Sequence, residues 1–456
     1  MKRASERPAK AGHAAAKQAA RTVLLSAIAL MSGGRSLAQE PVQPLTAPAD
    51  RRVDLDFLRY YTGDQLQAAL ESLAGAYPEF LRLESMGKSR GGRELWVVTL
   101  SARDGTEALR KGAVLVVGSS SADDPHGVEM ALFTIYDIAL NHARDPVLAE
   151  TLAAATLYLV PCLDPDARAL LLEPASDASP LAREVALERN FPAGWNPWDG
   201  RAGGPYPLSE PETRALADFL TAHPNVALVQ TYSQAPPASP SGAGLVLPPA
   251  DGAAHAALLA RATAQLEEGE DLVAAPAAGL RGGSLLAHVV LDRGALGFTS
   301  HLAGRGQGRL PQVQELFGLA RRAGSHTLLL TRALPRLRIA AASVTRLRNE
   351  LWQVDLDVEN AGLMETAAPL AHTRRMVLPP GFEVAGGKLM AVAMAAPGEG
   401  ELRPLPGPAS AFALPEIPGG GRVQLRLVVS APGETTLSLS VSAPRAGAAQ
   451  GSVTLR

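Results

Sequence analysis

The chain has 456 residues, of which 46% are hydrophobic and 19% are charged, and its formal net charge is −2. The length allows more than one domain, and the nearly balanced charge argues against nucleic acid as a partner. The single cysteine, Cys162, excludes a fold held by internal disulfides. No apolar segment is long enough to cross a bilayer, which argues against an integral membrane protein.

The N-terminal segment has the three parts of a secretory signal peptide. Basic residues run from Lys2 to Arg21, the apolar stretch TVLLSAIALM follows, and small residues precede a cleavage point after Ala38. We predict a signal peptide over residues 1–38 and a Pro/Ala-rich spacer over residues 39–52. The alternative is a disordered basic tail. Cleavage would remove seven basic residues and one glutamate, so the net charge would change from −2 to −8. We expect export to the periplasm or the extracellular space.

Strands and helices alternate through the middle of the chain. Segment 113–118 is fully apolar, as in a strand that is buried on both faces, and a helical pattern follows it. Segment 155–161, ATLYLVP, is predicted to be another buried strand. Ser209 and Glu212 have the spacing of a capping box at the start of a later helix. The alternation predicts an α/β domain over residues 53–333, with a mainly parallel sheet that helices cover on both faces.

The pattern changes near residue 336. From there to residue 456 the sequence contains no convincing helix. Short alternating runs such as WQVDLDVEN and RVQLRLVVSA are separated by Gly/Pro turns. This pattern is typical of a β-sandwich, so we predict a C-terminal all-β sandwich domain over residues 336–456.

Several motifs of the first domain, in a definite order and spacing, carry a resemblance to a known family. They are the helix and strand pair in residues 60–101, LYLVPCLDPDA, RNFPAGW with GPYPLSEPETRAL, and RGGSLLAHVVLDRGALGFTSHL. In these motifs the chain resembles the zinc carboxypeptidases, the carboxypeptidase A-like metallopeptidases, over roughly residues 55–330. The resemblance implies the doubly covered sheet of that family, a zinc cofactor and substrates with a free C-terminus.

The positions that bind and use zinc in that family are substituted in this chain. The resemblance places the family's H-x-x-E zinc pair at Ser121 and Asp124, its second zinc histidine at Gln230, and its catalytic glutamate at His301. A catalytic zinc needs about three imidazole or anionic ligands, whereas a hydroxyl and an amide are neutral and weak. His301 could accept a proton, but without a metal it has no activated water to serve. We therefore expect no intact catalytic residue, no intact metal site and no cofactor.

Two rearranged metal sites are alternatives. A literal H-x-x-E stands five residues later, at His126 and Glu129, but the favoured explanation is an exposed loop histidine and a first-turn glutamate stabilised by the helix dipole. A second alternative is an oxygen-rich cation site at the strand ends. Its candidate ligands are Asp123, Asp124, Asp164, Asp166 and His301.

Arg189, in the RNF motif, keeps the family's residue. The resemblance assigns the matching arginine to the pocket for the substrate's C-terminal carboxylate, and a bidentate contact of this kind needs no metal. The alternative is a structural arginine that is paired with Glu188 or another nearby acid. For the second arginine of the family pocket, the candidates are Arg168 and Arg183.

These substitutions favour an exported, catalytically degenerate family member with a binding or scaffolding role. Peptides or cell-envelope peptide material are the ligands expected. The alternative is an active metallocarboxypeptidase, or a related amide hydrolase, with a rearranged metal site. A third interpretation is that the first domain only displays the β-sandwich. The sequence thus leaves enzymatic activity open.

Overall fold

The computed structural model describes the chain from residue 50 onward, with gaps. The chain divides into two units, Met1–Pro48 and Ala49–Arg456, and every described residue belongs to the second. The predicted signal peptide lies outside the described residues, as does nearly all of the predicted spacer. The described ranges are 50–102, 108–121, 126–172, 185–198, 200–233, 249–263, 272–274, 280–301, 313–407 and 410–456.

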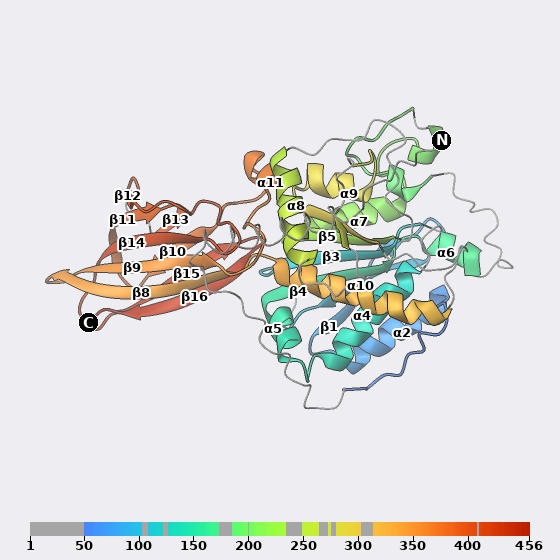
Figure 1. Ribbon diagram of the computed structural model, residues 1–456, viewed down its shortest axis with the longest axis horizontal. Coiled ribbons are helices and arrows are strands. Elements are labelled where there is room, and N and C mark those ends of the chain that lie inside the picture. Colours follow the sequence, from blue (N-terminus) through green and yellow to red (C-terminus); the bar gives the residue numbers. More distant parts are fainter. Residues whose placement is uncertain are drawn as a thin grey trace, which may run out of the picture. The chain divides into compact units, whose positions relative to one another are not determined.

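A seven-stranded mixed sheet forms the centre of the α/β region (Figure 1). Its strand order is β1-β2-β4-β3-β5-β7-β6. The β4–β3, β3–β5 and β5–β7 pairings are parallel, whereas β1–β2, β2–β4 and β7–β6 are antiparallel. The strands are β1 (Leu81–Lys88), β2 (Glu94–Leu100), β3 (Gly112–Ser119), β4 (Ala155–Cys162), β5 (Val226–Ser233), β6 (Leu272–Ala274) and β7 (Leu296–His301).

The prediction of an α/β region is confirmed, and the prediction of a mainly parallel sheet is corrected to a mixed one. The reason lies in the short turn between β1 and β2, which can only join antiparallel neighbours. Because β2 also pairs with β4, it brings its reversed direction into the sheet. Parallel pairing is confined to the centre, where β3 and β4 are buried along their whole length.

Helices pack against both faces of this sheet, and each face has its own hydrophobic core. One core joins residues of α2, α4 and α10 to Val114 and Val116 of β3. The other joins residues of α7 and α9 to Leu115 and Val117 of the same strand, as the alternation of side chains along a strand requires. The helices are α2 (Gly63–Ala76), α4 (Gly127–Asn141), α5 (Pro146–Ala154), α6 (Pro165–Leu172), α7 (Pro211–Ala222), α8 (Pro249–Thr263), α9 (Leu285–Ala287), α10 (Val313–Ala333) and α11 (Pro369–Thr373).

The end of β3 lies directly against the start of α4. A Cβ atom added to Gly127 would lie 1.8 Å from the carbonyl oxygen of Gly118. Only glycine permits so close an approach of two backbones. The contact therefore fixes the position of the chain at the end of β3. The turn that carries Ser121 begins there.

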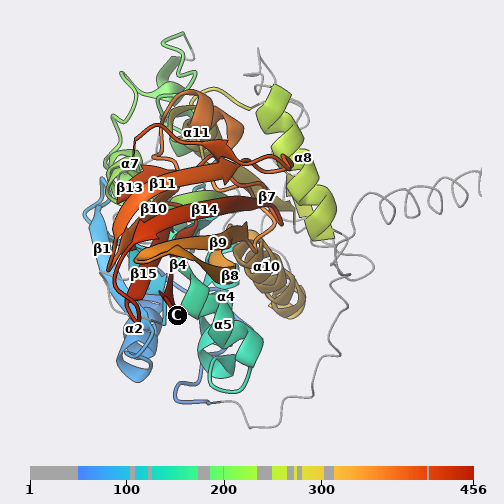
Figure 2. The ribbon, with the colours of Figure 1, turned by 90° about the vertical axis from the view of Figure 1, so that its left-hand side faces the viewer.

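Where the structure describes it, the C-terminal region is built of β-strands and the short helix α11 (Figure 2). The strand pairings of its two sheets are antiparallel. The five-stranded sheet has the order β12-β11-β14-β9-β8, and the four-stranded sheet has the order β13-β10-β15-β16. Both sheets contribute side chains to one hydrophobic core. The predicted all-β region is confirmed, and its description as a sandwich stays a prediction. The strands are β8 (Leu337–Arg348), β9 (Leu351–Asn360), β10 (Gly381–Ala385), β11 (Lys388–Ala395), β12 (Arg403–Pro404), β13 (Ala411–Ala413), β14 (Arg422–Ser430), β15 (Thr436–Ala443) and β16 (Gly447–Thr454).

Within the described ranges, no helix combines the length and the apolar character that crossing a membrane requires.

Candidate functional site

Three of the predicted site positions lie on, or just after, three adjacent parallel strands. Ser121 follows the end of β3 by two residues, Gln230 lies in β5, and His301 is the last residue of β7. In the sheet, β5 lies between β3 and β7. Ligand sites of open α/β sheets form at the carboxyl ends of such strands. Asp123 and Asp124 fall outside the described residues.

Gln230 is held inside the protein by hydrogen bonds at both ends of its amide. Its Nε2 donates to Ser300 Oγ of β7 at 2.7 Å, and its Oε1 accepts from Thr327 Oγ1 of α10 at 2.9 Å. The side chain has no solvent exposure. Thr327 Oγ1 also lies 2.8 Å from Tyr232 Oη, and burial raises the pKa of Tyr232 to about 12. Gln230 is therefore one member of a buried, neutral hydrogen-bond network.

The turn after β3 is linked to the opposite wall by Glu188. Ser120 Oγ donates to Glu188 Oε1 at 2.8 Å, and the backbone N–H of Leu285 donates to Glu188 Oε2 at 3.2 Å. Ser119 Oγ in turn donates to the carbonyl oxygen of Ser121 at 3.0 Å. One carboxylate thus connects the end of β3, the 3-10 helix η2 (Leu187–Arg189) and the start of α9. The sequence motifs contained no signal for this link.

Arg189 is half-buried beside Glu188. Its backbone N–H donates to Ala186 O at 2.9 Å, and a Cβ atom added to Gly283 would lie 2.5 Å from its carbonyl oxygen. The backbone is therefore fixed. Across the part of the chain that the structure describes, the Arg189 guanidinium has neither a hydrogen bond nor an ion pair. The Glu188 carboxylate accepts hydrogen bonds from Ser120 and from the backbone N–H of Leu285.

Asn190 organises the loop that follows Arg189. Its Nδ2 donates to Gly203 O at 2.8 Å and to Ser209 Oγ at 2.9 Å. Its Oδ1 accepts from Glu210 N at 3.1 Å and from Thr213 Oγ1 at 2.7 Å. Asn190 has no exposed surface. The side-chain amide therefore ties the loop over residues 190–209 to the start of α7.

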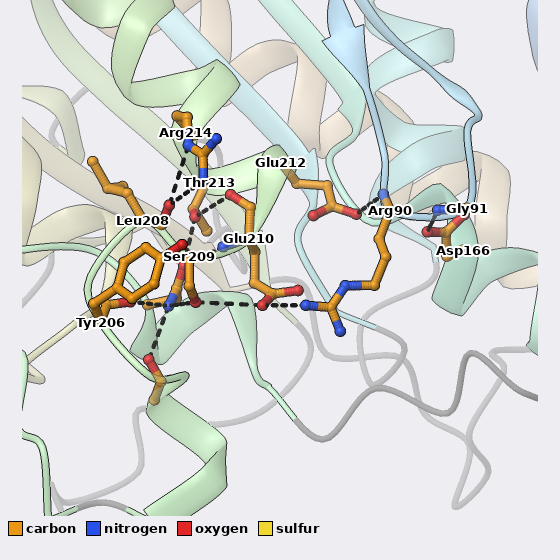
Figure 3. A network of polar contacts seen from close by, with 12 residues as sticks. Arg90, Gly91, Asp166, Tyr206, Leu208, Ser209, Glu210, Glu212, Thr213 and Arg214 are labelled. Carbon is orange, nitrogen blue, oxygen red and sulfur yellow. Dashed lines mark hydrogen bonds and ion pairs between the residues drawn. The ribbon is translucent and has the colours of Figure 1, made fainter.

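The predicted capping box at Ser209 and Glu212 is wrong. The N-cap of α7 is Glu210, with no side-chain capping bond. Ser209 Oγ is used by Asn190, and the Glu212 carboxylate accepts the N–H of Arg90 at 3.0 Å. The Arg90 guanidinium donates to Glu210 at 2.8 Å, which Figure 3 shows together with the Glu212 contact. The Ser209 hydroxyl and the Glu212 carboxylate, which a capping box would have used, thus bind residues that are distant in the sequence.

Asp166 has a structural role in the same network. Its carboxylate accepts from Ser89 Oγ at 2.9 Å, from Gly91 N at 2.8 Å and from Arg93 Nη1 at 2.7 Å. Asp164 Oδ1 accepts from Ala167 N at 3.1 Å, at the start of α6. In the described ranges, no group of three or more His, Cys, Asp or Glu side chains could hold a metal ion.

The literal H-x-x-E has its glutamate inside the core. Glu129 Oε1 accepts from Tyr61 N at 2.9 Å and forms an ion pair with Arg168 Nη2. Burial raises the pKa of Glu129, and the charge of Arg168 opposes this shift. His126 also has no exposed surface, so the expectation of an exposed loop histidine is wrong. Arg168, a candidate for the carboxylate pocket, is buried in this pair and donates through Nε to Tyr61 O at 2.8 Å. Arg183 lies outside the described residues.

Two family models match the chain, one in each region. Residues 66–236 match the model described as zinc carboxypeptidase, and residues 336–454 match a domain of unknown function (DUF8731).

Curated relatives match part of the chain. Carboxypeptidase SOL1 of Arabidopsis thaliana is 29% identical over 180 residues, which cover 39% of this chain and 34% of the relative. Carboxypeptidase M of Mus musculus is 25% identical over 169 residues, 36% of each chain. The match therefore covers only about a third of the length of these two relatives.

Among solved structures, the thrombin activatable fibrinolysis inhibitor is similar at 16% identity and a TM-score of 0.48, over 60% of this chain and 74% of that chain. Carboxypeptidase A from Helicoverpa armigera is similar at 17% identity and a TM-score of 0.48, over 69% of this chain and 80% of that chain.

Proposed function

We propose that the protein, whose residues 66–236 match the zinc carboxypeptidase family model, is an exported, catalytically degenerate member of that family that binds the C-terminal ends of peptides. Its ligands are peptides or cell-envelope peptide material. Catalysis by zinc has been lost, and recognition of the substrate's free carboxylate has been kept.

The hydrogen bonds of Gln230 are the observation that carries the loss of catalysis. A zinc ligand must turn a lone pair toward the metal, beside a position left open for water. Both ends of the Gln230 amide are instead used by Ser300 and Thr327 in the core. At Ser121, the side chain offers a neutral hydroxyl. These residues do not fit a catalytic zinc, so no catalytic step is assigned to one.

The guanidinium of Arg189 supports retained binding. It is half-buried, its backbone is fixed, and no acidic side chain among the described residues neutralises it. A guanidinium of this kind can take a carboxylate through two parallel hydrogen bonds. The loop around it is held by Asn190 and Glu210, so the pocket wall is rigid before a ligand arrives.

Protein purified from metal-replete medium is expected to contain far less than one zinc per chain and to leave C-terminal peptide substrates intact. Elemental analysis and a peptidase assay measure the two quantities. Stoichiometric zinc that is lost in His126→Ala would contradict the proposal and establish the shifted H-x-x-E as the metal site.

Arg189→Ala is expected to weaken the binding of peptides with a free C-terminus by about one to two orders of magnitude. A hydrogen bond to a charged group contributes about 1.5–3 kcal/mol, which sets this range. Calorimetric titration of a short-peptide library, each peptide in free and C-terminally amidated form, measures the change.

The matched control is Arg214→Ala. Arg214 is an exposed arginine of α7 that donates to Leu208 O, and its loss should leave peptide affinity unchanged. If wild type binds no peptide, or binds free and amidated peptides equally, carboxylate recognition is excluded and a scaffolding role takes its place.

A further inference from the structure

A cavity of about 560 Å³ lies between helix α5 and strands β8 and β16, away from the carboxylate pocket. Five charged residues line it, from both the α/β and the all-β regions: Arg110, Lys111, Glu150, Arg336 and Arg338. Four are cationic and one is anionic, so the lining has a net formal charge of +3. The whole chain has a net charge of −2, so this concentration of positive charge is local.

The guanidinium of Arg336 retains hydrogen-bonding capacity. Its Nη1 lies 3.1 Å from Glu150 Oε1, but the Glu150 side chain is 71% exposed. An ion pair to so exposed a carboxylate is weak and easily exchanged. The Nε of Arg336 is buried and has no hydrogen-bond partner among the residues that the structure describes. The backbone N–H of Arg336 is fixed by Asn360 Oδ1 at 3.0 Å, so the base of this side chain is held in place.

The negative end of α5, whose last residues also line the cavity, is offset by Lys111. Lys111 Nζ donates to Leu152 O at 2.8 Å, in the last turn of the helix. A cation at a helix C-terminus compensates the partial charge of the free carbonyl groups. The remaining positive charge, on Arg110, Arg336 and Arg338, is therefore not cancelled by the helix.

Small residues create the space for a ligand. Ala153 and Ala154 contribute on the α5 side, and Ala446, Gly447 and Ala448 contribute on the β16 side. Gly447 has φ +75°, a conformation that favours glycine. A volume of about 560 Å³ lies within the range of small-molecule sites.

We propose that this cavity binds a small anion with at least two negative charges, presented by phosphoryl or carboxylate groups. Arg336 is the central contact, and Arg338 and Arg110 surround the anion. The bound anion connects the α/β region to the all-β region. This site is independent of the peptide pocket.

The test is calorimetric titration of the full chain with pyrophosphate and with citrate at constant ionic strength. One anion per chain is expected, and the tighter of the two probes identifies the preferred group. Arg336→Gln and Arg338→Gln should each weaken binding by about tenfold or more. Because Arg338 is exposed, its variant tests the site without risk to folding.

The matched control is Arg348→Gln, the same change at the far end of β8. It lies ten residues from Arg338, roughly 30 Å along the strand, and should leave anion affinity unchanged. Arg189→Ala should bind the anion like wild type, which separates this result from the fate of the peptide proposal. Binding of neither probe would overturn the inference, as would equal weakening by Arg338→Gln and Arg348→Gln.

Discussion

Arg168→Ala is expected to lower the free energy of unfolding by about 3–5 kcal/mol, because it leaves the buried Glu129 carboxylate without its cation. Glu129 has no exposed surface, and Arg168 is 4% exposed. The variant also removes the hydrogen bond from Arg168 Nε to the carbonyl oxygen of Tyr61. Urea unfolding at pH 8, compared at constant m-value, measures the loss.

The destabilisation should shrink as the pH falls. Burial already raises the pKa of Glu129 in the folded protein, and loss of Arg168 raises it further. Protonation then favours the folded state, since the unfolded carboxyl has the lower pKa. Stability is thus gained as the pH falls through the folded-state pKa. The deficit of Arg168→Ala relative to wild type is expected to be smaller at pH 5 than at pH 8.

Two further variants test this explanation. The double variant Glu129→Gln, Arg168→Met removes both charges and should recover most of the stability that Arg168→Ala loses. The contribution of the hydrogen bond to Tyr61 O is not recovered. Arg82→Ala removes an exposed arginine of β1 and should change stability by no more than about 0.5 kcal/mol. A deficit of Arg168→Ala that is independent of pH would contradict the role given to the Glu129 charge.

Arg445→Ala is expected to cost about 2–5 kcal/mol, because it leaves two backbone carbonyl groups without their donor. Arg445 lies between β15 and β16 and is 5% exposed. Its Nη2 donates to Arg293 O at 2.6 Å, and its Nη1 donates to Gly294 O. These contacts join the all-β region to the segment that precedes β7.

The burial of this cation has a cost of its own. Desolvation, with a contribution from Arg293, lowers the pKa of Arg445 to about 10. In the part of the chain that the structure describes, no carboxylate forms an ion pair with it. The two charge-assisted hydrogen bonds must therefore offset the desolvation penalty. For this reason the expected loss of unfolding free energy in Arg445→Ala is smaller than the summed contribution of two charge-assisted hydrogen bonds.

Calorimetric and urea unfolding of Arg445→Ala and Arg445→Lys measure this contribution. Lysine keeps the charge but not the planar fork, so an intermediate loss is expected. Arg403→Ala removes an exposed arginine of the same region, paired with Glu399 at 3.7 Å, and should have little effect. Wild-type stability of Arg445→Ala would show that the two carbonyl groups find other partners.

The sequence by itself indicated the class of the fold and the positions at which we propose that the zinc-site residues of the family are substituted. The apolar runs of β3 and β4 and the alternating runs after residue 336 are local patterns, and each needs only its neighbours in the chain to be recognised. The order of the motifs around Asn190 and the helix that follows it likewise indicated the family before any contact was known. Ser121, Gln230 and His301 can then be proposed as substitutions without coordinates.

Only the tertiary structure decided what those residues do. Gln230 and its partner Thr327 are 97 residues apart, and Arg93 and Asp166 are 73 residues apart. Nothing local in the sequence distinguishes Ser209 as a partner of Asn190 from Ser209 as a helix cap, or a buried His126 from an exposed one. The spacing of apolar residues within one helix or strand predicts which of its faces is buried, because this pattern is contained in the element's own sequence. Hydrogen-bond and ion-pair partners depend on strand order and helix packing, and these bring together side chains from segments that lie far apart in the chain.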